Sequence, residues 1–289
     1  MHELKQYDTV QNQIDELRLS SQPANKVMIW VEGNDWKLYH RFFNPDMVDH
    51  QGRTGGYSCH TAIDSYKEFK RQYPTRLAIV IRDADFKRVN GESLVADDDI
   101  FYADSHDHEM MCMCQVKVRE ALKDNFMLGD KGDTLFQKIF NELQSLSYFK
   151  WYSYNKSCGY NFSTLGNLSA ISDDFFTDLN KIEEKVYGRS VSERTKKGIT
   201  DPLKRIDLKE FSDFIALHPD PDYYEITNGH DFYCRINYYL KKIDANNARR
   251  EDALKEVVYT AFSFVFQNTQ LYSRLSIWCN NNTNILKAS

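Results

Sequence analysis

Two short apolar segments most constrain how this chain can fold, because each has the length of a strand and each is followed within two residues by an acid. Residues 27–31 have the sequence VMIWV, and residues 77–81 have the sequence LAIVI. Segments this apolar are typical of strands that are covered on both faces, as in the parallel sheet of an α/β domain. The sequence therefore predicts a buried parallel sheet at the start of an α/β fold.

Helical spacing of apolar residues follows each predicted strand. It predicts helices over residues 36–43, 61–73 and 107–122, with a short strand at 100–102 before the last of them. Strands and helices that alternate with short connections indicate right-handed crossovers and a small parallel sheet.

The remainder of the chain has a different pattern. From about residue 130 onward the periodicity is mostly helical, apart from a polar stretch at 187–207 and a strand candidate at Tyr223–Ile226. The expected organisation is an N-terminal polar helix over 1–25, an α/β domain over 26–125 and a mostly helical region over 126–289.

Composition limits the functions that suit this chain. Its 289 residues are 42% hydrophobic, which suits a folded protein with a substantial core. With 37 basic and 42 acidic residues, net charge −5, the whole molecule would not hold a polyanion, so any nucleic-acid contact must come from a local patch. Six scattered cysteines and the lack of a leading apolar segment favour reduced thiols in the cytoplasm, and no apolar run is long enough for a membrane span.

Acidic residues follow the predicted strands. Glu32 follows the first strand, Asp83 and Asp85 follow the second, and Glu109, with Asp107 beside it, follows the third. The carboxyl ends of parallel strands line one crevice, so these side chains are expected to converge. With no cluster of bases near them in the sequence, they would repel one another unless a cation such as Mg²⁺ or Mn²⁺ neutralised them.

Two alternatives compete with this metal site. Each acid taken alone could be a helix cap or a solvated turn residue, because Asp and Glu are common at helix starts. A zinc site is the other alternative, since His108 and Cys112 lie one helical turn apart near His106 and Cys114. Those thiols fall on an apolar helix face, which disfavours zinc.

The best phosphate-binding stretch is a basic segment over residues 185–209, which would otherwise be a solvated loop. Its candidate nucleic-acid contacts are Lys196, Lys197, Lys204 and Arg205. The dense aromatic residues of 148–154 could stack on bases, although core packing is favoured for them.

These acidic segments resemble a known family. Val31-Glu32-Gly33 with Asp35 and Trp36, then Ile81-Arg82-Asp83-Ala84-Asp85-Phe86, then His108-Glu109, are similar to the TOPRIM domain. The match is closest to the short TOPRIM proteins allied to the OLD nucleases, which include the toxin subunit of the PARIS phage-defence system. The resemblance covers about residues 26–125. A weaker similarity lies at Asn228-Gly229-His230-Asp231, because such effectors often carry Gly-His-Asp before a helix.

The resemblance implies a Mg²⁺- or Mn²⁺-dependent endonuclease. Glu32, Asp83 and Asp85 would be catalytic, and these three with Glu109 would hold the metal. Four further side chains would lie beside the ligands or contact the substrate, namely Asp35, Asp107, Lys156 and His230.

The resemblance also implies a biological setting. The chain would be a toxic effector in anti-phage defence, held inactive by an ABC-type ATPase partner and cleaving host RNA, with tRNA favoured. A homodimer is compatible with this setting, and a membrane is not expected. The alternatives are an OLD-like nuclease that nicks or degrades DNA and a catalytically silent regulatory subunit that binds metal. The partner is expected to contact an exposed aromatic surface made of Tyr238, Tyr239, Phe262, Phe264, Phe266, Tyr272 and Trp278.

Overall fold

A computed structural model of the chain describes residues 26–287 apart from 34, 52–58, 95–97, 166–167, 169–170, 173–174, 177, 197, 199–202 and 244–250. The expected N-terminal helix over 1–25 lies outside the described residues. The chain divides into two compact units that interleave in sequence, whereas the predicted boundaries were contiguous. The sheet unit comprises residues up to 84, 93–104 and 263–289, and the helical unit comprises 85–92 and 105–262.

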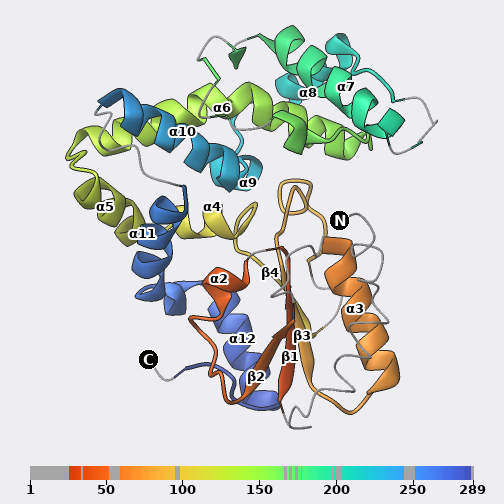
Figure 1. Cartoon of the computed structure of the whole chain (residues 1–289), viewed down its shortest axis with the longest axis vertical. Helices are drawn as coiled ribbons and strands as arrows, with labels where there is room; N and C mark the ends of the chain where they lie inside the picture. The colour runs from red at the N-terminus through yellow and green to blue at the C-terminus, as the bar shows by residue number, and fades with distance from the viewer. Residues whose placement is uncertain are drawn as a thin grey trace. The chain divides into compact units, whose positions relative to one another are not determined.

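The sheet unit is built on four parallel strands, which confirms the small parallel sheet and the α/β fold class (Figure 1). The strands are β1 (Val27–Val31), β2 (Val48–Gln51), β3 (Ala78–Arg82) and β4 (Ile100–Tyr102), in the order β2-β1-β3-β4. Strand β2 was not predicted, because its sequence VDHQ carries no apolar run. It forms an edge of the sheet, where a short polar strand is tolerated.

The strand order places a topological switch point between β1 and β3. The chain leaves β1 for β2 on one side, and β3 and β4 follow on the other side. Val31 pairs with Ile81, so the carboxyl ends of the two central strands are level with each other. In open parallel sheets, ligands bind beyond the carboxyl ends of the strands at such a point.

Helices cover the sheet. Helix α3 (Cys59–Gln72) lies along one side of it, and α12 (Gln270–Asn281) lies along the other (Figure 1). Trp30 of β1 packs against Tyr66 and Phe69 of α3, with ring centroids 6.2 and 5.2 Å apart. All five residues of β1 are buried, as the apolar run predicts.

The helical unit confirms the prediction of a mostly helical C-terminal region. Its elements are α4 (His108–Met113), α5 (Val116–Asn125), α6 (Lys131–Asn155), η2 (Phe162–Leu165), α7 (Leu179–Lys196), α8 (Leu208–Leu217), α9 (Tyr223–Ile226), α10 (Gly229–Ile243) and α11 (Glu251–Ser263). None of the helices in the described part of the chain has the length and apolar character to cross a membrane.

Two predicted elements differ in kind from those observed. The strand candidate at Tyr223–Ile226 is the helix α9, because the Asp222 carboxylate accepts the amide N–H of Tyr224 at 2.9 Å and caps a helical turn. The polar stretch from 187 is helical as far as Lys196, since α7 buries Ile182 and Val186 and needs few other apolar residues.

One predicted helix is divided. The helix expected over 107–122 is two helices, α4 and α5, with an extended backbone at Gln115. Arg119 of α5 donates to the carbonyl oxygens of Met113 and Cys114 at 2.7 and 2.9 Å, and so satisfies carbonyl groups at the end of α4.

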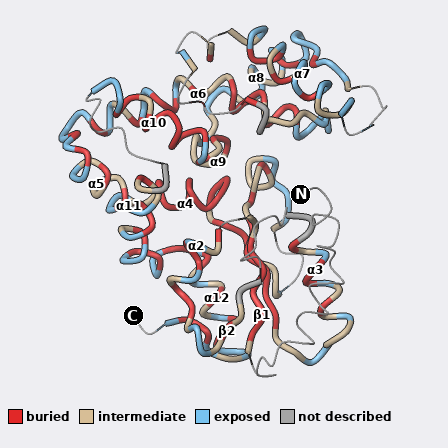
Figure 2. Tube along the Cα trace, viewed as in Figure 1, coloured by how far each residue is buried: buried red, intermediate tan, exposed pale blue. Residues whose placement is uncertain are grey.

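Burial tests two predictions about aromatic residues, namely core packing of the 148–154 segment and an exposed aromatic surface for a partner (Figure 2). In the 148–154 segment, core packing is confirmed for Tyr148, Phe149, Trp151 and Tyr152, which are buried, while Tyr154 is exposed. The prediction that seven aromatic residues form an exposed surface is wrong for most of them. Four are buried, namely Tyr239, Phe262, Phe266 and Trp278, and Phe264 is exposed.

Candidate functional site

Two predicted site residues, Glu32 and Asp83, lie where the switch-point rule places a ligand site. Glu32 directly follows β1 and Asp83 directly follows β3, at the carboxyl ends of neighbouring parallel strands in the sheet unit. The strands therefore bring these two residues, distant in sequence, to one edge of the sheet, as the sequence predicts.

The turn after β1 adds a third carboxylate. Gly33 has φ +47°, a left-handed conformation that glycine adopts without strain, and the carbonyl of Glu32 accepts the N–H of Asp35 at 3.0 Å. Asp35 then starts α2 (Trp36–Tyr39), and its side chain is buried. One carboxylate oxygen of Asp35 lies within 4.8 Å of one of Asp83.

A buried arginine accompanies these acids. The Nε of Arg82, the last residue of β3, lies 3.4 Å from Oε1 of Glu32, and the two side chains are 7% and 18% exposed. The Arg82 guanidinium also lies over the ring of Tyr102, 5.2 Å from its centroid. The repulsion expected among the acids is therefore partly offset at Glu32 by this guanidinium.

These donors suit a hard divalent cation at the sheet edge. Asp35 and Asp83 offer carboxylate oxygens close enough together to share an ion, which is the ligand chemistry of Mg²⁺ and Mn²⁺. Two like charges this close repel each other, and a cation would relieve that repulsion. Glu32, with Arg82 beside it, already has a positive neighbour.

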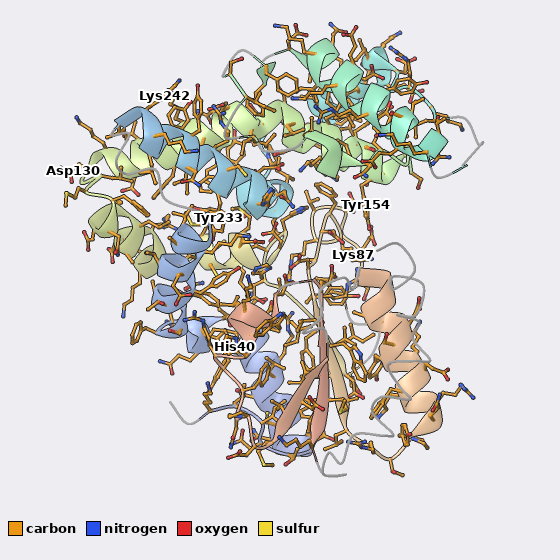
Figure 3. All side chains as sticks on the ribbon, viewed as in Figure 1. His40, Lys87, Asp130, Tyr154, Tyr233 and Lys242 are labelled. Atoms are coloured by element: carbon orange, nitrogen blue, oxygen red, sulfur yellow. The ribbon has the colours of Figure 1, made fainter. Side chains whose placement is uncertain are left out.

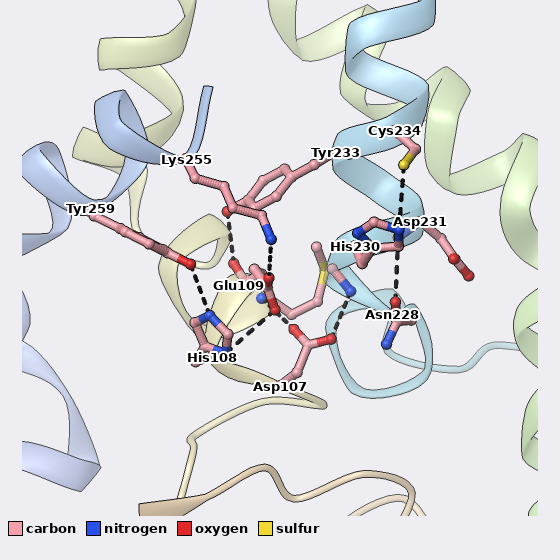
Figure 4. Close-up of polar contacts among 12 residues, drawn as sticks. Asp107, His108, Glu109, Asn228, His230, Asp231, Tyr233, Cys234, Lys255 and Tyr259 are labelled. Atoms are coloured by element: carbon pink, nitrogen blue, oxygen red, sulfur yellow. Dashed lines mark hydrogen bonds and ion pairs between the residues drawn. The ribbon is translucent and has the colours of Figure 1, made fainter. Parts of the chain in front are cut away.

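The predicted third group of acids belongs to the helical unit and is built differently (Figure 4). Asp107 is the N-cap of α4, and its carboxylate accepts the N–H of Met110 at 2.8 Å and the N–H of Gly229 at 2.7 Å. A β-carbon at Gly229 would lie 2.2 Å from Cβ of Glu109 and 2.7 Å from Oδ1 of Asp107. Only glycine fits there, so the Gly-His-Asp segment packs directly on the Asp107–Glu109 segment.

Glu109 is buried among its own partners. One carboxylate oxygen lies 3.0 Å from Nζ of Lys255, and the other lies 3.4 Å from Nδ1 of His108, whose Nε2 is 2.9 Å from the Tyr259 hydroxyl (Figure 4). The Tyr233 hydroxyl donates to the Glu109 carbonyl at 3.3 Å. Burial raises the pKa of Glu109, but His108 and Lys255 outweigh it, and the pKa is lowered overall. In this arrangement Glu109 fits an ion pair better than a metal site.

The zinc alternative receives no support from the described residues. Burial raises the pKa of the Cys112 thiol well above its usual value, and burial raises that of Cys114 to about 11. Cys114 lies 3.1 Å from the Ser105 hydroxyl, and His108 contacts Tyr259. Within the described ranges, neither Cys112 nor Cys114 belongs to a group of donors that could hold a metal ion.

Asp85 lines a pocket of about 680 Å³ that lies wholly within the helical unit. Its backbone has φ +49°, which is rare for a residue other than glycine, and its N–H donates to the carbonyl of His106 at 2.8 Å. The other residues that line the pocket are Phe86, His106, Lys150, Ser153, Tyr154, Ser157, Gly159, Tyr160, Phe162 and Asn228.

The last turn of α6 forms one wall of this pocket. Lys150, Ser153 and Tyr154 are spaced by three residues and one, which places them on one face of the helix, and Ser157 follows in the turn that ends α6. Tyr154, labelled in Figure 3, has its ring centroid 5.4 Å from that of Phe86. The pocket thus combines the end of α6 with the turn that follows Asp85.

A Schellman turn ends α6 at the pocket. The N–H of Cys158 donates to the carbonyl of Ser153 at 3.0 Å, and the N–H of Ser157 donates to that of Tyr154 at 3.1 Å. Ser157 stands at the left-handed position of this turn, with φ +50°, where glycine is usual. The turn sends the chain back along α6, so that Tyr160 and Phe162 reach the same pocket.

The remaining predicted site residues are dispersed over the helical unit. Asp231 is buried and pairs with Lys150, while the exposed His230 lies 3.6 Å from Sγ of Cys234. Lys156 forms an exposed ion pair with Glu210, at 3.0 Å. Of the two lysines near the end of α6, Lys150 is the one that lines the pocket with Asp85.

The candidate nucleic-acid contacts lie on the surface of the helical unit. Lys196 is exposed at the end of α7, Lys204 and Arg205 are exposed before α8, and Lys197 lies outside the described residues. Arg205 pairs with Glu183 at 3.4 Å, and its guanidinium lies over the ring of Tyr187. Their exposure is compatible with phosphate binding.

Comparisons with models of protein families, with curated proteins and with solved structures find no match for this chain. The two sites themselves are therefore the structural basis for a function. Because Glu32 and Asp83 belong to the sheet unit and Asp85 and Glu109 to the helical unit, the convergence of all four remains a prediction.

Proposed function

We propose that this chain is a metal-dependent nuclease of the TOPRIM type. The observation that carries the proposal is the acidic group at the carboxyl ends of β1 and β3, where an oxygen of Asp35 lies within 4.8 Å of one of Asp83 and Glu32 directly follows β1. A switch point of a parallel sheet that carries several carboxylates is suited to a divalent cation and an anionic ligand. The sequence resemblance gives Glu32 and Asp83 as metal ligands and places Asp35 beside them.

The residues of the sheet edge have distinct roles in this proposal. Asp35 and Asp83 would hold Mg²⁺ or Mn²⁺, which when bound polarises a phosphoryl oxygen and lowers the pKa of water. Arg82 would hold the Glu32 carboxylate in one orientation through their 3.4 Å ion pair. Glu32 is then placed to accept a proton as general base. Asp85 would contribute from the turn that follows β3.

The direct test is cleavage by the purified chain. A labelled tRNA pool, a single-stranded RNA and a single-stranded DNA are incubated with the protein in Mg²⁺, Mn²⁺, Ca²⁺ or EDTA, and the ends of the products are sequenced. We expect cleavage of RNA in Mg²⁺ or Mn²⁺ and none in EDTA or in Ca²⁺ alone, because Ca²⁺ adopts a looser geometry. Cleavage in EDTA would contradict a metal-dependent reaction, and cleavage of DNA alone would favour the OLD-like alternative.

Two variants link that activity to the site. Asp83→Asn removes one proposed ligand charge at the sheet edge, and Asp64→Asn removes an exposed charge from α3 in the same unit. We expect cleavage to be lost in Asp83→Asn and retained in Asp64→Asn. If both variants cleave like the parent chain, the sheet edge is not the active site.

A second candidate is a catalytically silent subunit that only binds metal. It is favoured by the ion pairs of Arg82 with Glu32 and of Lys255 with Glu109, which already provide positive charge to two of the four predicted ligands. Isothermal titration with Mn²⁺ separates the two candidates when it is combined with the cleavage assay. Binding that Asp83→Asn abolishes, with no cleavage of any substrate, would support the silent subunit.

The proposed setting is a cytoplasmic toxic effector of anti-phage defence that an ABC-type ATPase holds inactive. Its support is the sequence resemblance, because the aromatic surface expected to contact the partner is mostly buried. Co-expression with the product of the neighbouring gene, followed by size-exclusion chromatography, tests it. Expression of the chain alone should be toxic, and Asp83→Asn should remove the toxicity; a harmless parent chain that elutes alone would contradict this setting.

A further inference from the structure

The pocket of the helical unit has features of a binding site for a flat, uncharged ring. We propose that it holds one unstacked nucleobase of a single-stranded nucleic acid, an inference that rests on the proposed nuclease function and adds a base-binding subsite to it. Its volume of about 680 Å³ lies within the usual range of small-ligand pockets, roughly 300–1,000 Å³, and exceeds the size of one base. Five observations support this assignment.

Aromatic side chains come to this pocket from three separate segments. Phe86 follows β3 in sequence, Tyr154 lies in the last turn of α6, and Tyr160 and Phe162 follow the turn after α6. The Tyr160 and Phe162 rings are 6.2 Å apart at 86°, so one can face a ligand while the other presents its edge. Every base has a π-face, and stacking on such rings is how proteins hold unpaired bases.

The ring of Tyr160 is held firmly. It stacks on the buried Phe149 with centroids 5.8 Å apart and an interplanar angle of 3°, and its hydroxyl donates to Glu183 at 3.3 Å. Burial raises the pKa of Tyr160, and Glu183 adds to this, so the hydroxyl stays protonated. A stacking surface that is fixed before the ligand arrives loses little entropy on binding.

The charges of the pocket suit a base better than a phosphate. The one lysine among its described lining residues, Lys150, pairs with Asp231, and both side chains are nearly buried, 12% and 11% exposed. Asp85 adds a further negative charge to the lining. A phosphate would therefore meet a site with no net positive charge, whereas the donors and acceptors of a base edge can pair with Asp85, Asn228 and Ser153.

Backbone strain is concentrated at the same place. Among the described residues, three other than glycine have positive φ, and two of them, Asp85 at +49° and Ser157 at +50°, line this pocket. Strained residues persist where the surrounding structure fixes them, and they cluster at binding sites and active sites. The fold thus holds two polar side chains in the pocket at a cost in stability.

Positive charge lies at the edge of the pocket. A guanidinium nitrogen of Arg194 is 3.9 Å from the position that a β-carbon on Gly159 would occupy. Lys204 is exposed in the segment before α8, next to Leu203, which lies 3.7 Å from the same position. A chain whose base enters the pocket would have cations near its phosphates, and a free base would gain nothing from them.

The test measures binding without cleavage. Single-stranded 12-nucleotide RNA and DNA with 2-aminopurine at one position are titrated with the full chain in EDTA, and affinity is followed by anisotropy of a terminal fluorophore. We expect quenching of 2-aminopurine on binding, because stacking on an aromatic ring quenches it. Tyr160→Leu and Phe162→Leu should remove the quenching and weaken binding about 5- to 100-fold, as expected for the loss of one stacked base.

Phe264→Leu is the matched control, because Phe264 is 72% exposed and belongs to the sheet unit. It should bind and quench like the parent chain. Tyr160→Phe keeps the ring and should retain quenching, so it distinguishes loss of stacking from loss of the Glu183 contact. Melting curves identify any leucine variant that fails to fold. In that case Ser157→Trp is used in its place, because its side chain fills the pocket from the turn at the edge. This variant should abolish quenching.

Three further arms identify the ligand. The fully paired duplex should bind without quenching, because its bases are stacked. Free mononucleotides at millimolar concentration should not displace the oligonucleotide; if they displace it, the ligand is a nucleotide rather than a base within a chain. Unchanged binding and quenching in Tyr160→Leu and Phe162→Leu would overturn the proposal. That failure differs from failure of the nuclease proposal, which is judged by Mg²⁺-dependent cleavage in Asp83→Asn.

Discussion

The acids of the sheet edge and the acids of α4 differ in how their charges are balanced. At the sheet edge, Asp35 and Asp83 are like charges within 4.8 Å of each other. At α4, the Asp107 carboxylate accepts two backbone N–H groups, and Glu109 lies between Lys255 and His108. Both groups follow strands in a similar sequence context.

The difference teaches that the position of an acid after a strand does not determine its role. Two crowded carboxylates are stabilised by a cation, so they suit metal binding. A buried carboxylate that already has a lysine and a histidine beside it contributes to folding, and removing it leaves a buried charge without its partner. We therefore expect substitutions at the sheet edge to change activity most and substitutions at α4 to change stability most.

The largest expected effect is at Glu32. Glu32→Gln keeps the size and hydrogen-bonding atoms of the side chain and removes its charge, so cleavage should fall about 10²–10⁴-fold, as for the loss of a general base. Because Arg82 is buried beside it, the free energy of unfolding should fall by about 1 kcal/mol. Single-turnover cleavage and urea denaturation measure the two effects.

The matched control for Glu32 is Asp64→Asn, an exposed acid on α3 of the same unit. It should change neither the cleavage rate nor the urea midpoint. A folded Glu32→Gln chain that cleaves at the parent rate would remove the sheet edge from the mechanism and erase the contrast with α4.

A large loss of stability is expected at Gly229. The β-carbon of Gly229→Ala would lie 2.2 Å from Cβ of Glu109, and neither backbone can move away without breaking the contact of Asp107 with this amide. Overpacking of this kind costs about 3 kcal/mol. Urea denaturation measures it, with Gly188→Ala as the control, because a β-carbon at Gly188 of α7 meets no atom within 4 Å. Equal stability of the two variants would show that the glycine is not required there.

A smaller loss is expected at Glu109, and it should depend on pH. Glu109→Gln removes the ion pair with Lys255 but keeps an amide oxygen that can accept a hydrogen bond from the Lys255 Nζ. The free energy of unfolding should therefore fall by about 2 kcal/mol at pH 7. The folded pKa of Glu109 is lowered, so its stabilisation is present above the unfolded pKa and is lost as the pH falls through the folded pKa.

Urea denaturation of the parent and Glu109→Gln chains between pH 3 and 7 checks this sign. The difference between them should be largest near neutral pH and should shrink on acidification below the ordinary glutamate pKa of about 4.3. A difference that grows as the pH falls would contradict the lowered pKa. A loss of Mn²⁺ affinity equal to that of Asp83→Asn would instead assign Glu109 to the metal.

The core of the fold could be predicted from the sequence because its signals are local. The apolar runs at 27–31 and 77–81 predict β1 and β3, and the spacing over 61–73 predicts α3. Strand β2 could not be predicted, since VDHQ becomes a strand only by pairing with β1. The helix at Tyr223–Ile226 was missed because its aromatic sequence favours a strand, and the Asp222 cap outweighs that preference.

The candidate site could be predicted only in part, because several residues that contact its acids are distant from them in sequence. Glu32 and Asp83 follow from strand ends, and Arg82, adjacent to Asp83, was a signal that could have identified the cation beside Glu32. Lys255 has no such signal, since 146 residues separate it from Glu109. The pocket was equally hidden, because its aromatic walls depend on the turn after α6 that brings Tyr160 and Phe162 back.

The smallest expected effect is a gain of stability at that turn. Ser157 occupies the left-handed position of the Schellman turn with φ +50°, where a β-carbon costs about 1 kcal/mol relative to glycine. Ser157→Gly should therefore raise the free energy of unfolding by about 1 kcal/mol, whereas Ser157→Ala, which keeps the β-carbon, should leave it nearly unchanged; thermal and urea denaturation measure both. If the serine is retained for the pocket, the more stable Ser157→Gly chain should bind single-stranded oligonucleotides less tightly. Greater stability together with unchanged binding would mean that the strained backbone of Ser157 does not contribute to ligand binding. The pocket turn, like the acids of α4, would then contribute only to the folded structure.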